Sequence, residues 1–169
     1  AQMTKDIDPD FDPAKHTLTE SSYFEDLEIG QRFLSPSRTL GDANFAAFQM
    51  VSGDNHPIHY DEEYCRRRGY PGMLAHGLQV AAQCAQGAGM LPHVLEDSLI
   101  CLIEHSAKFL KPVYSGDTVY TALEVIDLTP RNTTGVITLR TTVHNQRRQL
   151  VLEGEQKMLV KKRSTAANK

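Results

Sequence analysis

The segment SGDNHPIHYD, residues 52–61, places an aspartate and two histidines around a proline. Asp54 and His59 lie five positions apart, with Pro57 between them. A solvated turn needs no pair of imidazoles, whereas proton transfer and metal binding both use imidazole and carboxylate groups. Across a proline turn, Asp54 and His59 can both point at one bound water molecule. The segment therefore indicates either an active site or a metal site.

The sequence before this segment predicts a helix that leads into it. NFAAFQMVSG, residues 44–53, carries its apolar residues at helical spacing. Its last residue, Gly53, suits the left-handed position that ends a helix. Pro57 removes an N–H and disfavours helical backbone at the residue before it. We therefore expect a helix to end at Gly53 and the chain from Asp54 to His59 to form a turn.

Two more helices are expected after the turn. Asp61 can cap the first, whose opening turn is acidic and whose last turn holds the arginines at 66–68, in agreement with the helix dipole. The second runs from Gly77 to about Met90 and is rich in small residues, so a sheet can wrap closely around it. Backbone N–H groups at its start, beside His76, have no partner within the helix and can face a ligand.

After Pro92 the apolar period changes from helical spacing to two, which predicts β-strands. The alternation is clear in GVITLRTTVH, residues 135–144, where Ile137 and Leu139 lie on one side and Arg140 lies on the other. Three or four such strands, joined by short connections with Asp, Pro or Asn, form an antiparallel meander. The expected fold class is therefore α+β, with helices first and a sheet after them.

The two ends of the chain differ in composition from the rest. Residues 1–22 repeat Asp and Pro without an apolar period, so we expect an N-terminal extension there. Residues 162–169 are basic and are expected to form a flexible tail. Between them, residues 23–161 form one domain, which fits a chain of 169 residues.

Charge and cysteine content limit the classes of partner. A net charge of −3 gives no general basic field for nucleic acid. Three widely spaced cysteines form neither a disulfide framework nor a zinc knuckle, which favours a reducing compartment. The first residues lack the apolar region of a signal peptide, and polar residues interrupt the low-charge stretch 73–95. We expect a cytoplasmic protein that binds neither nucleic acid nor a membrane.

The order of the motifs resembles that of the MaoC-like dehydratases, the group of (R)-specific enoyl-CoA hydratases. SGD at a helix end is followed by P-I-H, by A-H-G-L at the start of a long helix, and by F-x-x-P-V-x-x-G-D-T before the strands. The resemblance covers residues 23–161 and implies a single hot-dog domain, an antiparallel sheet wrapped around a long central helix. It also implies a homodimer or higher homo-oligomer with an acyl-CoA tunnel between subunits. We expect no cofactor and no metal ion.

The resemblance also implies roles for individual residues. Asp54 and His59 are expected to act together on the water that adds to a trans-2-enoyl thioester. The N–H of Gly77 is expected to face the thioester carbonyl, with help from the positive end of the helix dipole. The family pattern is G-D-x-N-P-x-H, so a histidine stands here in the asparagine position and can alter the turn or the acyl pocket. The residues expected to bind substrate are His56, Pro57, Ile58, His76 and Leu78.

Three other functions compete with hydration. A metal enzyme can use Asp54, His56 and His59, but no HExxH motif or cysteine cluster supplies the further ligands of a catalytic zinc site. A hot-dog thioesterase places an acid on or near the central helix, where this chain has glutamines. A non-catalytic acyl-binding subunit predicts a broken Asp/His pair, and here the pair is whole. His76 is expected to orient its turn rather than to donate a proton.

Overall fold

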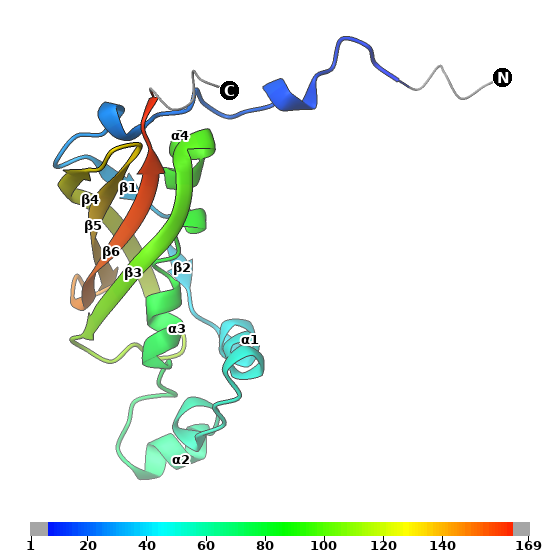
Figure 1. Ribbon diagram of the computed structural model, residues 1–169. Helices are drawn as coiled ribbons and strands as arrows, with labels where there is room; N and C mark the ends of the chain where they lie inside the picture. The colour runs from blue at the N-terminus through cyan, green and yellow to red at the C-terminus, as the bar shows by residue number, and fades with distance from the viewer. Residues whose placement is uncertain (1–6, 164–169) are drawn as a thin grey trace.

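The structure, a computed structural model, describes residues 7–163. Six strands form one antiparallel sheet (Figure 1): β1 (Arg32–Leu34), β2 (Arg38–Thr39), β3 (Leu99–Phe109), β4 (Thr118–Pro130), β5 (Thr134–Asn145) and β6 (Leu150–Lys161). Their order in the sheet is β1-β4-β5-β6-β3, and β2 pairs with β4. The prediction of an α+β fold with an antiparallel sheet is confirmed.

All of the described helices precede the long strands in the sequence. The α-helices are α1 (Asp42–Ser52), α2 (Glu62–Arg67), α3 (Gly77–Ala82) and α4 (Leu91–Leu95), and the 3₁₀ turns are η1 (Pro13–Lys15), η2 (Phe24–Asp26), η3 (Pro57–His59), η4 (Gln86–Ala88) and η5 (Glu96–Ser98). Gly53 ends α1 with φ 68°, and the Asp61 side chain caps α2 by accepting a hydrogen bond from the Tyr64 N–H at 2.8 Å. Both helix boundaries agree with the sequence prediction.

The helix expected to run from Gly77 to about Met90 ends at Ala82, so the prediction of one long central helix was wrong. The 3₁₀ turn η4 and the short helix α4 occupy the rest of that stretch. Its two glycines each disfavour helix by about 1 kcal/mol relative to alanine. The Gln156 side chain of β6 also donates a hydrogen bond to the Cys84 carbonyl at 2.8 Å. This contact with β6 thus occupies the Cys84 carbonyl, which would accept a hydrogen bond within the helix if the helix continued.

Two clusters of buried apolar side chains join the helices to the sheet. One packs Leu95 of α4 against Ile137 and Leu139 of β5. The other brings Phe45 of α1 and Val80 of α3 onto the same sheet. The alternation in β5 therefore places its apolar side in the core, as predicted. In Figure 1, α1 and α2 lie beyond one end of the sheet, with α3 between them and the strands.

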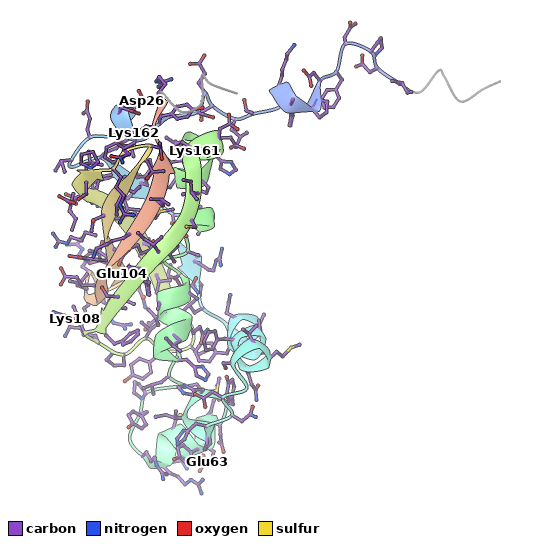
Figure 2. All side chains as sticks on the ribbon, viewed as in Figure 1. Asp26, Glu63, Glu104, Lys108, Lys161 and Lys162 are labelled. Carbon is purple, nitrogen blue, oxygen red and sulfur yellow. The ribbon has the colours of Figure 1, made fainter. Side chains whose placement is uncertain are left out.

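The strand β3 differs from the other long strands because almost all of it is exposed. It pairs with β6 along one edge and is the last strand of the sheet, so no described strand covers its other edge. Ile100, Leu102 and Ile103 are 43–46% exposed. On the same strand, Glu104, which is labelled in Figure 2, accepts a hydrogen bond from Lys157 of β6. An unpaired edge with apolar side chains offers a surface to another chain.

The N-terminal segment joins the domain at the same end of the sheet at which β6 ends (Figure 1). Residues 7–20 are exposed and extend away from the strands (Figure 1). At the last described residue, the Arg163 guanidinium forms an ion pair with Asp26 of η2; Asp26 is labelled in Figure 2. The rest of the expected extension and tail, residues 1–6 and 164–169, lies outside the described residues. Among residues that the structure describes, no helix has both the length and the apolar character needed to span a membrane.

Candidate active site

The turn after α1 is held by hydrogen bonds between side chains and the backbone. Asp54 Oδ1 accepts a hydrogen bond from the His56 N–H at 3.1 Å. His56 Nδ1 accepts one from the Ile58 N–H at 3.2 Å and so caps η3, which begins at Pro57. His56, Pro57 and Ile58, which were expected to bind substrate, thus form the turn that orients the side chains of Asp54 and His59. The histidine in the asparagine position performs the capping that an asparagine side chain would perform.

His59 ends η3, and its side chain is mostly shielded from solvent. Its Nδ1 lies 2.6 Å from the Leu74 carbonyl oxygen. Because a carbonyl oxygen only accepts, Nδ1 carries a proton and donates it to this bond. The neutral ring therefore has its lone pair on Nε2, which lies 4.0 Å from Asp54 Oδ2. The structure brings together the two residues that the sequence indicated.

His76 joins this pair more closely than the sequence indicated. Its buried ring stacks on the ring of His59, with centroids 3.6 Å apart and planes inclined by 21°. His76 Nε2 lies 3.3 Å from Asp54 Oδ2, which is closer than His59 Nε2 comes. Tyr60 is a further member that the sequence analysis missed, because its hydroxyl is hydrogen-bonded to His76 Nε2 at 3.3 Å. The signal available in the sequence was the position of Tyr60 directly after P-I-H.

The surroundings shift the proton affinities of these groups in different directions. The His56 N–H holds the pKa of the Asp54 carboxyl below its ordinary value, and the neighbouring imidazoles act in the same sense. Burial lowers the pKa of His59, and the ring of His76 adds to this effect. Burial and the Asp54 charge raise the pKa of Tyr60. Together these shifts favour an ionised Asp54 and a neutral His59 near neutral pH.

A metal ion is the other candidate for this cluster. One ligand atom from each of Asp54, His59 and His76 lies within 4.8 Å of the other two. However, the lone pairs of two nearly parallel stacked rings run side by side, whereas metal ligands must converge on one point. The set also differs from the one considered from sequence, because His56 Nδ1 is bound to the Ile58 N–H. The arrangement fits proton transfer better than metal coordination.

Two cavities lie near the cluster. One, of about 320 Å³, is lined by His59 and Tyr60 together with residues of α1 and α2. The other, of about 270 Å³, is lined by Gly77 and Phe109, at the start of α3 and the end of β3. Leu78, which was expected to bind substrate, is 70% exposed and lines neither cavity.

The start of α3 leaves a backbone donor at Gly77. His76 precedes it as the N-cap but makes no side-chain capping bond, and the first N–H groups of a helix have no acceptor within the helix. A Cβ at Gly77 would lie 3.2 Å from the Phe109 ring, so glycine permits this close packing. Since α3 has only six residues, its dipole is weaker than that of the long helix expected. Any stabilisation of a ligand oxygen here therefore depends on the Gly77 N–H more than on the dipole.

Comparison with known proteins gives a consistent result. The MaoC like domain family matches residues 25–147. The (R)-specific enoyl-CoA hydratase of Rhodospirillum rubrum is 31% identical over 142 residues, which are 82% of this chain and 91% of that protein. The solved (R)-hydratase from A. caviae, described as involved in PHA biosynthesis, superposes with a TM-score of 0.66 at 29% identity, over 80% of this chain and 96% of that one.

A further solved structure identifies the architecture. RV0216 of Mycobacterium tuberculosis, a conserved hypothetical protein described as having a double hotdog fold, superposes with a TM-score of 0.70 at 29% identity. The match covers 83% of this chain but 44% of that one. The six-stranded sheet with its helices therefore has hot-dog relatives.

Proposed function

The chain belongs to the MaoC-like domain family, and on that basis we propose that it is an (R)-specific enoyl-CoA hydratase. In the reverse direction it acts as a 3-hydroxyacyl-CoA dehydratase. The observation that carries the proposal is the convergence of Asp54 and His59, whose facing atoms are 4.0 Å apart beside a cavity. The functional unit proposed is the domain of residues 23–161, and neither a cofactor nor a metal ion is assigned to it.

The distance between Asp54 Oδ2 and His59 Nε2 suits a shared water molecule. A water oxygen can lie at about 2.8 Å from each of two atoms separated by 4.0 Å. An ionised Asp54 and a neutral His59 both accept hydrogen bonds, and water has two O–H groups to donate. The pair removes one proton as the oxygen bonds to Cβ of the enoyl group, and a proton is delivered to Cα. The reaction is redox-neutral, and no covalent enzyme intermediate is needed.

The developing negative charge on the thioester oxygen needs a donor. We assign this role to the Gly77 N–H, which faces no acceptor within α3 and borders the 270 Å³ cavity. A single donor of this kind is worth about 10²–10³ in rate in well-studied enzymes. His56, Pro57 and Ile58 support the site by fixing the turn, and Leu78 is available to the acyl group from the exposed start of α3.

The assembly proposed is a homodimer formed through β3. This strand has no described neighbour on its outer edge and exposes Ile100, Leu102 and Ile103. Burying apolar area stabilises association by roughly 25 cal/mol per Å² before the costs of association are subtracted. Such an interface would extend the sheet and bring the partner close to Phe109, at the end of β3.

Incubation of the protein with crotonyl-CoA tests the proposal. We expect the absorbance of the conjugated enoyl thioester to decrease without release of free thiol, and the product to be the (R)-3-hydroxy thioester. Release of free CoA would instead indicate a thioesterase, and unchanged substrate in a stoichiometric complex would indicate an acyl-binding subunit. Either of these results overturns the assignment to hydration.

A further inference from the structure

The two ring nitrogens of His76 lie in different surroundings. Nδ1 is buried and has no hydrogen-bonding partner among the described residues. Nε2 lies 3.3 Å from Asp54 Oδ2 and 3.3 Å from the Tyr60 hydroxyl. The ring is fixed between His59, which stacks on it, and Phe48 of α1, whose ring centroid is 4.8 Å away.

These surroundings select one tautomer of His76. A proton on Nδ1 would leave a buried N–H without an acceptor and would turn the Nε2 lone pair toward the Asp54 carboxylate. Both effects are unfavourable, since a buried donor without a partner loses its hydrogen bond to water and gains none in return. A proton on Nε2 instead faces two oxygen atoms, one of which belongs to a carboxylate with a lowered pKa. The neutral ring of His76 therefore carries its proton on Nε2.

His59 has the opposite tautomer. Its Nδ1–H is donated to the Leu74 carbonyl, so its Nε2 presents a lone pair toward Asp54. The stacked rings thus present different groups to one carboxylate: His76 presents a donor and His59 presents an acceptor. The two histidines are not interchangeable, although both come within 4.0 Å of Asp54 Oδ2.

We propose that His76 is a positioning residue, which holds the Asp54 carboxylate through Nε2–H so that Asp54 and His59 face the same water molecule. This deepens the hydratase proposal and rests on it for the role of the water. His76 itself touches neither water nor substrate in this proposal. The groups that face its ring are Asp54, His59 and Tyr60, and Phe48 covers it from α1 without adding charge.

Direct measurement of the tautomers tests the inference without reference to any reaction. In ¹⁵N NMR spectra of the wild-type protein near neutral pH, we expect His76 to show the Nε2–H tautomer and His59 the Nδ1–H tautomer. A protonated Nδ1 on His76 would overturn the proposal. Because no substrate is added, this result does not depend on whether the protein hydrates an enoyl thioester.

Two substitutions separate positioning from packing. His76→Phe keeps an aromatic ring against His59 but loses the N–H, whereas His76→Gln keeps an N–H at a similar reach. We expect His76→Phe to lower kcat by about 10–100-fold, by analogy with the loss of groups that orient metal ligands in metalloenzymes, with little change in KM. We expect His76→Gln to recover part of this loss.

The same variants have a readout that packing alone would not change. Without its donor, the Asp54 carboxylate should take up a proton at higher pH, so the pKa of Asp54 in ¹³C NMR titrations should rise in His76→Phe and less in His76→Gln. The acidic limb of the kcat/KM profile should move in the same direction. A folded His76→Phe protein with an unshifted Asp54 titration would overturn the proposal. If His76→Phe does not fold, the wild-type tautomer measurement still tests the proposal.

Discussion

His59 and His76 stack with their ring centroids 3.6 Å apart, and both direct a nitrogen toward Asp54 Oδ2. The two rings come from different elements, the 3₁₀ turn η3 and the residue that precedes α3. Their contact joins the turn after α1 to the helix that carries Gly77. A change in either segment should therefore affect both halves of the proposed site.

The Asp54 carboxylate is the first group to test. We expect Asp54→Asn to lower kcat for hydration of crotonyl-CoA by about 10²–10⁴-fold, because an amide cannot act as a general base. The side chain is about half exposed, so the thermal midpoint should change little. Glu62→Gln is the matched control, since Glu62 lines the same cavity as His59 but lies outside the cluster. If Asp54→Asn keeps most of the wild-type hydration activity, the assignment of Asp54 to proton transfer is disproved.

The Gly77 N–H can be removed without disturbing the start of α3. Gly77 is the first residue of the helix, where proline is tolerated, and the preceding backbone at His76 has φ −58° and ψ 142°, which proline accepts. Gly77→Pro deletes the donor, and Gly77→Ala is the control that adds a Cβ against Phe109 but keeps the N–H.

We expect both Gly77 variants to lose some activity because the Phe109 ring must shift. The proline variant should lose about 10²–10³-fold more in kcat than the alanine variant. Single-turnover rates with crotonyl-CoA measure the difference, and circular dichroism checks the fold. Equal rates in the two variants would show that this N–H does not stabilise the thioester oxygen.

His56 can be tested as a capping residue. Its ring accepts the Ile58 N–H, a role that the Oδ1 atom of asparagine can also fill. We therefore expect His56→Asn to keep its stability, and His56→Ala to lose about 0.5–1 kcal/mol of unfolding free energy in urea titrations. A changed chain-length preference in His56→Asn would show a role in the acyl pocket as well.

The lowered pKa of His59 predicts a pH-dependent contribution to stability. In the unfolded chain His59 takes up a proton near its ordinary pKa of 6.5, whereas the folded protein resists this until the pH is lower. As the pH falls from above 6.5 through the folded pKa, the wild-type protein should lose stability relative to His59→Gln. Urea unfolding of both proteins across this range measures the effect. Parallel stability curves would contradict it.

The exposed strand β3 predicts an oligomeric state. Ile103→Lys should shift the protein toward monomer in light scattering, because a charge then occupies the proposed interface. Ile29→Lys is the control, since Ile29 is 62% exposed but lies before β1. Activity of the Ile103 variant should depend more steeply on protein concentration. If both variants behave as the wild type does, β3 is not the interface.

Cysteine reactivity provides a second check on β3. Burial raises the pKa of Cys84 to about 12, so its thiol should remain unmodified by iodoacetamide at pH 8. Cys101 lies on β3 and is exposed, so it should react in dilute protein. Pairing of β3 across a dimer should slow this reaction as the protein concentration rises. Peptide mass spectrometry distinguishes the two sites.

Local sequence signals predicted much of the site. Gly53 and Pro57 determine where α1 ends and where the turn begins, because each restricts the backbone within a residue or two. These restrictions are independent of the rest of the chain. The alternation along β5 likewise predicted its buried face, since a strand places successive side chains on opposite sides.

Contacts between distant residues account for what sequence reasoning missed. The helix after Gly77 ends early where Gln156 of β6 binds the Cys84 carbonyl, and no pattern near Cys84 indicates this bond. His76 was expected only to orient its own turn, because its approach to Asp54 depends on how α3 packs beside α1. The sequence by itself determined the reactive residue types and the turn that carries Asp54 and His59. Only the tertiary structure decided which histidine presents a donor and which an acceptor, since each tautomer depends on atoms that folding brings near from elsewhere in the chain.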